Sequence, residues 1–241
     1  MELVIGDEED LAHAVAGRIS EVLLSGARCP RVGLATGKSP RLSYEILRAL
    51  HQNQQIDLTR AVWVMLDEYV GLPPDHERRF DSELRRSIFG GLPLAVVNLL
   101  SPFPNDTSDG DSLDLFREAI ADKPVNLQLL GIGRNGHIAF NEPGSDFSSR
   151  ARIVRLSETT RDDMMRDGWD VADMPTHAAT QGLSDVMASQ EVLLLAFGES
   201  KVEAIRKAFR ERPNVSCPAS VLQNHPNVKL FITPEVAQVL R

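Results

Sequence analysis

The chain has 241 residues, 42% of them hydrophobic and 25% charged, which is the composition of a globular protein with a sizeable core. Its formal net charge of −8 argues against a general binder of nucleic acid or of an anionic membrane, so an anionic substrate would need a local group of cations. Cys29 and Cys217 form no metal-ligand spacing with histidine and no disulfide framework, which fits a reducing cytoplasm. The N-terminus lacks the features of a secretion signal, and no apolar run approaches the ~20 residues of a membrane span.

Apolar periodicity predicts strands that alternate with helices along the chain. Strands are expected at 2–5, 31–36, 61–66, 95–100, 126–130, 152–156, 191–197 and 228–232. Helices are expected at 8–25, 41–50, 76–90, 114–121, 157–168, in part of 176–189, at 201–210 and as a turn or two at 234–240, with a polar loop at 101–113. This order predicts a three-layer α/β/α sandwich, a mostly parallel Rossmann-like sheet with helices on both faces, in one domain spanning residues 1–241.

A Gly-rich turn, Gly33-Leu-Ala-Thr-Gly-Lys-Ser-Pro40, follows a predicted strand and leads into a helix. Such a turn points backbone N–H groups and a helix N-terminus at an anion, which suits a phosphate. Lys38 and the hydroxyls of Thr36 and Ser39 can add donors. The nucleotide-binding P-loop has four residues between its glycines, whereas Gly33 and Gly37 are separated by three. The alternative is that the glycines and the proline only form a turn and bind no ligand.

The apolar strand at 61–66 delivers Asp67 to its carboxyl end, where a carboxylate can act as a general base. The alternative is that Asp67 caps a following turn. The segment also resembles a Walker-B strand superficially, so nucleotide hydrolysis remains an alternative function at this point.

The most informative stretch is 126–143, an apolar strand closed by Gly131, Gly133 and Gly136 and followed by His137 and Glu142. The glycines allow a close approach of the backbone to a ligand, or a positive φ. Formally they satisfy the dinucleotide fingerprint, but a proline and a glycine at 143–144 interrupt the helix that a Rossmann site needs. An imidazole lies five residues from a carboxylate in this turn. That spacing favours a catalytic role for His137 over a purely structural one, and the turn is expected to form half of an active site.

Arg166 and Lys201 could each clamp a phosphate, although a single surface cation is more often only solvated. Four segments together nevertheless resemble the glucosamine-6-phosphate deaminase family, over about residues 30–230. They are Leu34-Ala-Thr-Gly-x-Ser-Pro40, Leu66-Asp-Glu-Tyr-Val-Gly-Leu72, Gly131-Ile-Gly-x-Asn-Gly-His-Ile-Ala-Phe-Asn-Glu-Pro143 and Gly198-x-Ser-Lys201. The sister family of 6-phosphogluconolactonases shares the fold but usually lacks the Phe-Asn-Glu-Pro and Asp-Glu-Tyr-Val-Gly continuations.

The resemblance implies conversion of D-glucosamine 6-phosphate and water to D-fructose 6-phosphate and ammonia, without a metal or a redox cofactor. It implies that Asp67 is the proton-transfer base and that His137 and Glu142 open the sugar ring. Asn135 belongs to the same catalytic turn, at a position where many members carry aspartate. The residues it assigns to substrate or phosphate binding are Thr36, Gly37, Lys38, Ser39, Gly136, Arg166 and Lys201.

The resemblance also implies an active-site lid at 157–179 and a cytoplasmic enzyme whose only expected partner is its phosphorylated amino sugar, with no nucleic acid and no membrane. Val154 and Asp146 depart from the lysine and serine of the allosteric, hexameric members, so a monomer or small homo-oligomer is expected. The alternatives left open are a galactosamine-6-phosphate deaminase, a 6-phosphogluconolactonase and a non-catalytic sugar-phosphate sensor.

Overall fold

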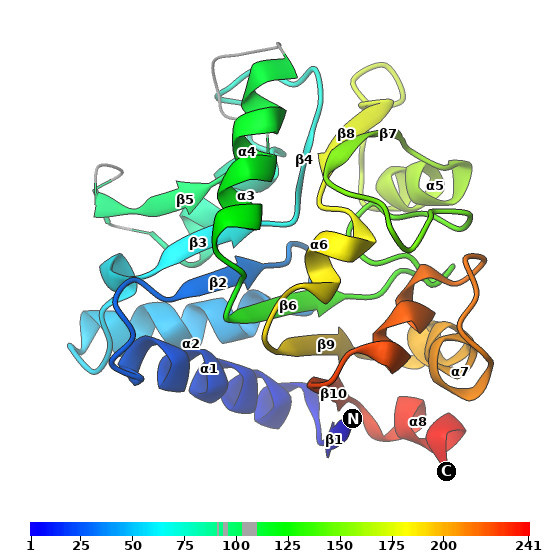
Figure 1. Cartoon of the computed structure of the whole chain (residues 1–241), viewed down its shortest axis with the longest axis horizontal. Coiled ribbons are helices and arrows are strands. Elements are labelled where there is room, and N and C mark those ends of the chain that lie inside the picture. The colour runs from blue at the N-terminus through cyan, green and yellow to red at the C-terminus, as the bar shows by residue number, and fades with distance from the viewer. Residues whose placement is uncertain (91, 94–95, 103–109) are drawn as a thin grey trace.

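The structure is a computed structural model that describes residues 1–90, 92–93, 96–102 and 110–241. Its main sheet contains seven strands in the order β1-β10-β9-β6-β2-β3-β5, and every pairing among them is parallel. The strands are β1 (Glu2–Ile5), β2 (Arg31–Leu34), β3 (Val62–Met65), β5 (Asn98–Leu100), β6 (Leu127–Gly131), β9 (Val192–Ala196) and β10 (Val228–Ile232). The predicted parallel sheet is confirmed (Figure 1).

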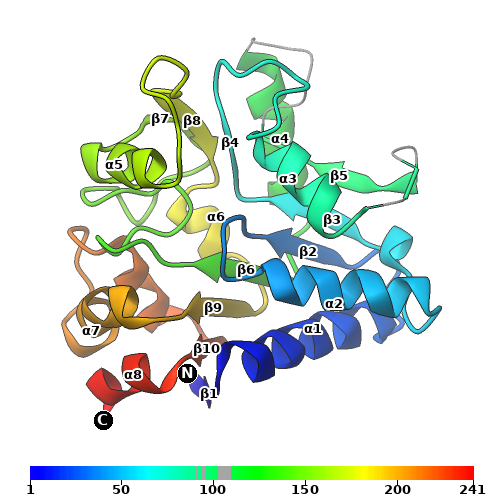
Figure 2. The ribbon, with the colours of Figure 1, turned by 180° about the vertical axis from the view of Figure 1, so that it is seen from behind.

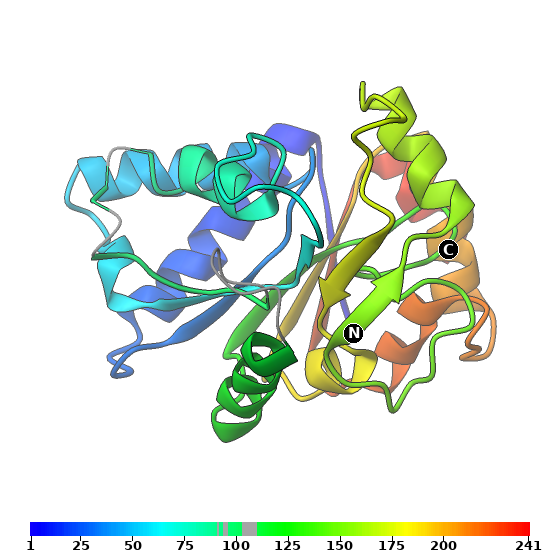
Figure 3. The same ribbon diagram turned by 90° about the horizontal axis from the view of Figure 1, so that it is seen from above.

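Helices cover both faces of this sheet, which confirms the predicted three layers. In Figure 1, α4 (Gly110–Asp122) and α6 (Leu183–Met187) stand in front of the sheet. Seen from behind in Figure 2, α1 (Glu8–Leu24), α2 (Arg41–Gln52) and α3 (Phe80–Ser87) cover the opposite face, and Figure 3 shows the two groups on either side of the strands. The remaining helices are α5 (Glu158–Arg166), α7 (Val202–Arg210) and α8 (Pro234–Ala237). Because both faces are covered, β9 is buried along its whole length.

The strand order places a topological switch point between β2 and β6. From β2 the chain proceeds outward to β3 and β5, whereas from β6 it proceeds in the other direction to β9 and β10. In open parallel sheets ligands bind in the crevice at the carboxyl ends of the two strands where the order reverses. The turns that follow β2 and β6 are the two Gly-rich turns singled out in the sequence.

A second, antiparallel sheet of three strands was not predicted. It has the order β4-β8-β7 and consists of β4 (Asp67–Tyr69), β8 (His177–Thr180) and β7 (Arg152–Arg155). The prediction that 176–189 is helical in part is confirmed by α6, but the strand at 177–180 in the same range was not predicted. Residues 177–180 are extended because their backbone pairs on one side with β4 and on the other with β7, contacts that no local pattern encodes.

Several element ends differ from the sequence prediction. The strand expected at 95–100 is Asn98–Leu100, and residue 95 lies outside the described residues. The helix expected at 76–90 begins only at Phe80, where the carboxylate of Glu68 accepts hydrogen bonds from the backbone N–H groups of Phe80 and Asp81 at 3.1 and 3.0 Å. Of the expected loop at 101–113, residues 103–109 lie outside the described residues, and 110–113 belong to α4. Within the described ranges, no helix combines the length and the apolar character required to cross a membrane.

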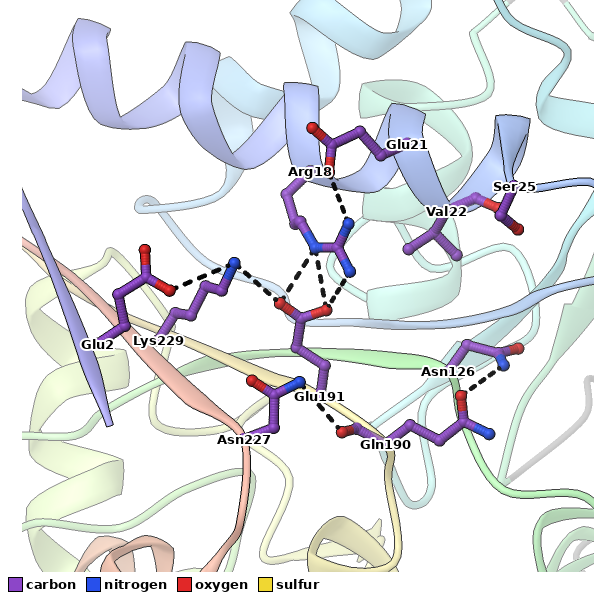
Figure 4. A network of polar contacts seen from close by, with 10 residues as sticks. All are labelled: Glu2, Arg18, Glu21, Val22, Ser25, Asn126, Gln190, Glu191, Asn227 and Lys229. Carbon is purple, nitrogen blue, oxygen red and sulfur yellow. Dashed lines mark hydrogen bonds and ion pairs between the residues drawn. The ribbon is translucent and has the colours of Figure 1, made fainter.

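At the amino-terminal edge of the main sheet, Glu191 joins four elements (Figure 4). Its side chain is 4% exposed, and its carboxylate accepts hydrogen bonds at 2.6 and 3.0 Å from Nη2 and Nε of Arg18 on α1. Lys229 of β10 lies 3.4 Å from the same carboxylate and 3.5 Å from Glu2 of β1. Burial alone would raise the pKa of Glu191, but the hydrogen bonds and charge of Arg18, with Lys229, outweigh it and lower that pKa.

We predict that Glu191→Gln lowers the free energy of unfolding at pH 7 by about 1–3 kcal/mol, because charge-assisted hydrogen bonds are lost. The folded-state pKa of Glu191 is depressed, so the wild-type advantage is present above the unfolded-state pKa and disappears as the pH falls through the folded-state pKa. Urea denaturation at several pH values measures both effects. Glu21→Gln is the matched control, because Glu21 contacts the same Arg18 but its side chain is 68% exposed. Equal losses in the two variants would contradict this account.

Candidate active site

Four segments that carry sequence-predicted site residues lie at one edge of the main sheet. Asp67 follows β3, the 36–39 turn follows β2, the 132–137 turn follows β6, and Lys201 lies in the turn that follows β9. These four strands are consecutive neighbours in the sheet, in the order β9-β6-β2-β3. Because they are parallel, their carboxyl ends share one edge, and segments up to 165 positions apart in the chain (from Thr36 to Lys201) therefore converge there.

Asp67 is joined to the histidine turn through β8. Its backbone pairs with Thr180, which is completely buried. The hydroxyl of Thr180 accepts a hydrogen bond of 3.1 Å from the backbone N–H of Phe140, three residues after His137. A single buried threonine thus connects the segment that carries the carboxylate to the segment that carries the imidazole.

Gln181 makes a second connection between the same segments. Its backbone N–H donates to the carbonyl oxygen of Leu66 at 2.7 Å, and its side-chain amide donates to the carbonyl oxygen of Met65 at 2.9 Å. Its own carbonyl oxygen accepts from the side-chain amide of Asn141 at 2.9 Å. Gln181 and Asn141 are buried, so breaking these bonds would leave polar groups unsatisfied, and the positions of the two segments are fixed relative to each other.

The environment of Asp67 makes it a strong base for a carboxylate. The residue is 7% exposed, and burial raises its pKa well above the ordinary value. The nearby carboxylates of Glu68 and Glu83 raise the pKa of Asp67 further, because a second negative charge disfavours ionisation. A base with a raised pKa accepts a proton from carbon more readily than an ordinary aspartate does.

Glu68, the next residue, has a structural role. Its buried carboxylate accepts hydrogen bonds from the backbone N–H groups of Tyr69, Phe80 and Asp81 and lies 3.4 Å from Nε of Arg79. It therefore fixes the start of α3 against β4. The same helix carries Glu83, so Glu68 also sets where that charge lies relative to Asp67.

His137 and Glu142 form the predicted imidazole–carboxylate pair, with Nδ1 of the ring 3.4 Å from Oε2 of the carboxylate. Glu142 also accepts a hydrogen bond of 2.8 Å from the side-chain amide of Asn135 and one from the hydroxyl of Thr160 on α5. Burial would raise the pKa of Glu142, but His137, Thr160 and Asn135 together lower it to about 2. Glu142 is therefore ionised at neutral pH and can balance a positive charge on the imidazole.

Two glycines of the histidine turn are required by the packing around them. A Cβ atom at Gly133 would lie 2.3 Å from Cε1 of His137, so only glycine lets the imidazole rest against this backbone. Gly136 has a φ of +85°, and a Cβ there would lie 2.5 Å from Sγ of the buried Cys217. The backbone of the turn thus packs against the His137 ring at Gly133 and against Cys217 at Gly136.

The 36–39 turn, the first predicted phosphate-binding element, connects β2 to α2. Gly37 has a φ of +91°, and its backbone N–H donates to the carboxylate of Glu83 at 3.3 Å. The ammonium group of Lys38 lies 2.8 Å from the carboxylate of Asp167, just after α5. Thr36 and Ser39 are partly buried in the same turn.

The two predicted clamp cations, Arg166 and Lys201, are each influenced by the carboxylate of Asp163. Arg166 on α5 lies 2.8 Å from Oδ1 of Asp163. Arg134, which the sequence did not single out, contacts the same carboxylate from the histidine turn. Burial lowers the pKa of Lys201, and the charge of Asp163 opposes that shift while the charge of Arg134 adds to it.

Several residues that shape the site were not foreseen in the sequence. Thr160, Thr180, Gln181 and Glu83 lie in no motif, and their importance depends on pairings between distant segments. Asn141 lies at a specified position of the 131–143 motif, whereas Arg134 occupies the unspecified position of that motif and has no such signal. The residues missed are Glu83, Arg134, Thr160, Asp163, Thr180 and Gln181.

A separate pocket of about 380 Å³ borders Glu142, between the 140–146 segment and β7. Asp146 and Val154, the two positions that depart from the allosteric members, both line it. The guanidinium of Arg152 in its wall donates to the side chains of Asn141 at 2.9 Å and Ser145 at 3.2 Å.

In the part of the chain that the structure describes, no group of three His, Cys, Asp or Glu side chains is arranged to hold a metal ion.

Comparison with known proteins connects this geometry to one family. A family model described as glucosamine-6-phosphate isomerases/6-phosphogluconolactonase matches residues 6–231. A glucosamine-6-phosphate deaminase of Beutenbergia cavernae is 41% identical over 244 aligned residues, which cover 100% of this chain and 93% of the relative. The deaminase of Pseudarthrobacter chlorophenolicus is 42% identical over 246 aligned residues, with the same coverage of 100% and 93%.

Solved structures agree with this result. A structure described as a monomeric glucosamine-6-phosphate deaminase superimposes with a TM-score of 0.90 at 30% identity, covering 99% of this chain and 100% of that one. The 6-phosphogluconolactonase of Trypanosoma brucei superimposes with a TM-score of 0.77 at 19% identity, covering 100% of this chain and 98% of its own, which shows that the fold is shared.

We predict that Gly133→Ala displaces the His137 ring and lowers any turnover that uses this imidazole by about 100-fold, as misplacement by about 1 Å can do. Gly131→Ala is the matched control in the same turn, because a Cβ there meets no atom within 4 Å. Steady-state turnover and the ring nitrogen NMR signals of His137 in both variants measure the effect. Wild-type turnover in Gly133→Ala would show that the close approach has no catalytic importance.

Proposed function

The chain belongs to the family of glucosamine-6-phosphate isomerases and 6-phosphogluconolactonases, and from this membership we propose that it is a glucosamine-6-phosphate deaminase. The reaction converts D-glucosamine 6-phosphate and water to D-fructose 6-phosphate and ammonia. The observation that carries the proposal is the junction of a buried base, Asp67, with an imidazole–carboxylate pair at one edge of the sheet. Lactone hydrolysis needs no base to remove a proton from carbon, whereas isomerisation does.

The first step of the proposed reaction opens the sugar ring. His137 donates a proton to the ring oxygen and accepts one from the anomeric hydroxyl, a transfer suited to an imidazole at neutral pH. Hydrogen bonds keep Glu142 ionised, and its carboxylate stabilises the positive charge that the imidazole of His137 carries during this exchange. The product is the open-chain amino aldehyde.

Asp67 performs the second step. Its carboxylate removes the proton from C2 while His137 returns to the C1 oxygen the proton that it accepted from the anomeric hydroxyl. Asp67 then donates the proton taken from C2 to C1 of the resulting enolamine. This leaves an iminium ion at C2, to which water adds with release of ammonia and formation of the ketone. The raised pKa of Asp67, caused first by burial, suits a group that must both remove and return a proton.

Binding of the phosphate supplies the positioning that makes these transfers effectively intramolecular. We assign it to the 36–39 turn, to the turn at Gly136 and to the cations Arg166 and Lys201. The predicted lid at 157–179 is shortened at its end, because residues 177–179 belong to the paired strand β8. Residues 157–176 act as the lid in this proposal, and two contacts support it. Thr160 on α5 donates to Glu142, and Asp167 contacts Lys38, so the position of this segment affects both the catalytic carboxylate and the phosphate turn.

The enzyme is further proposed to act in the cytoplasm as a monomer or a small homo-oligomer. The absence of cysteine motifs fits a reducing compartment. The structure with a TM-score of 0.90 is described as monomeric, and that description supports the smaller assembly.

A substrate panel tests the proposed function. We expect ammonia and fructose 6-phosphate from glucosamine 6-phosphate, followed by an ammonia-coupled assay and by identification of the ketose. Ammonia release mainly from galactosamine 6-phosphate would identify the epimeric deaminase instead. Opening of 6-phosphogluconolactone without ammonia from either amino sugar would contradict the proposal, and binding of all three without turnover would identify a sensor.

A further inference from the structure

A cluster of charges lies where three segments of the site meet. Asp163 on α5 is its centre, and Arg134 from the histidine turn contacts both oxygens of this carboxylate, with Nε 3.3 Å from Oδ2 and Nη2 bonded to Oδ1. Arg166, one turn further along α5, donates to the same Oδ1 at 2.8 Å. One aspartate therefore holds two guanidinium groups that come from different elements.

Lys201, in the turn after β9, belongs to the same cluster. The charges of Asp163 and Arg134 both affect the pKa of Lys201, after burial as the main cause. Interactions between charges act over distances longer than a hydrogen bond, so Lys201 is a neighbouring cation of this pair. The cluster thus combines the turn after β6, the turn after β9 and α5.

The charge of this cluster suits a phosphate monoester. Arg134, Arg166 and Lys201 carry three positive charges and Asp163 carries one negative charge, which leaves a net charge of about +2, while a phosphate monoester at neutral pH carries about −1.5 to −2. Arginine also binds phosphate through two parallel N–H groups, the same geometry that Arg134 uses toward Asp163. The side chain of Arg134 is 40% exposed, so a ligand can reach it from solvent.

We propose that Arg134 is a further phosphate-binding cation, which acts with Arg166 and Lys201 on the phosphate of the substrate. Asp163 is the intramolecular counter-ion that orients the two guanidinium groups, and the phosphate takes over one of its contacts. Because Arg134 lies three residues before His137, the turn that binds the phosphate through Arg134 also carries the imidazole. This inference rests on the proposed function, since it assigns a binding residue to that substrate.

Binding of glucose 6-phosphate, which has no amine to release, tests the inference without any turnover. Isothermal titration calorimetry compares wild type, Arg134→Gln and Arg134→Lys, with inorganic phosphate as a second probe and circular dichroism as the check that each variant folds. We expect Arg134→Gln to weaken binding of glucose 6-phosphate by about tenfold or more, and Arg134→Lys to restore part of the loss. The matched control is Arg206→Gln, because Arg206 is also 40% exposed and also paired with carboxylates, but on α7.

Kinetics separate this role from a purely structural one. With glucosamine 6-phosphate, Arg134→Gln should raise KM by a factor similar to the loss of affinity while kcat stays within about threefold. Unchanged affinity in Arg134→Gln, together with weakened binding in Arg166→Gln, would overturn the inference and leave Arg134 as a contact of α5 only. A wild-type protein that binds glucose 6-phosphate but releases no ammonia would refute the proposed function, while the affinity comparison would still decide the role of Arg134.

Discussion

The site depends on the buried hydrogen bonds of Thr180 and Gln181. These two residues connect the end of β3, where Asp67 lies, to the segment that follows His137. Their partners are backbone carbonyl and N–H groups and the amide of Asn141, and a buried group that lost its partner would cost about 1–3 kcal/mol. The relative position of base and imidazole is therefore set by the interior of the protein and does not rely on a mobile surface loop.

The same interior gives two carboxylates opposite properties. Asp67 is buried near two other carboxylates, so its pKa is raised and it is suited to exchange a proton with carbon. Glu142 is also largely enclosed, but His137, Thr160 and Asn135 lower its pKa to about 2, so it stays ionised. Two acidic residues whose environments separate their pKa values in this way can be assigned different roles, one as a base and one as a fixed charge.

Local patterns in the sequence were sufficient for much of the fold. The parallel strands were predicted because each is a short apolar run, and Asp67, His137 and Glu142 were singled out because each follows such a run in a recognisable turn. The strand at 177–180 was not predicted, because His177–Thr180 is extended only through its pairing with β4 and β7. Thr160 and Arg134 were missed for the same reason, since their partners lie 18 and 29 residues away.

The central claim is that Asp67 removes the proton from C2 of the amino sugar. Glucosamine 6-phosphate deuterated at C2, incubated with Asp67→Asn and followed by NMR, tests it directly, with binding of glucose 6-phosphate as the check that the site is intact. The account predicts binding similar to that of the wild type and loss of deuterium from C2 at least about 100-fold slower. Loss of deuterium at the wild-type rate would show that another group is the base.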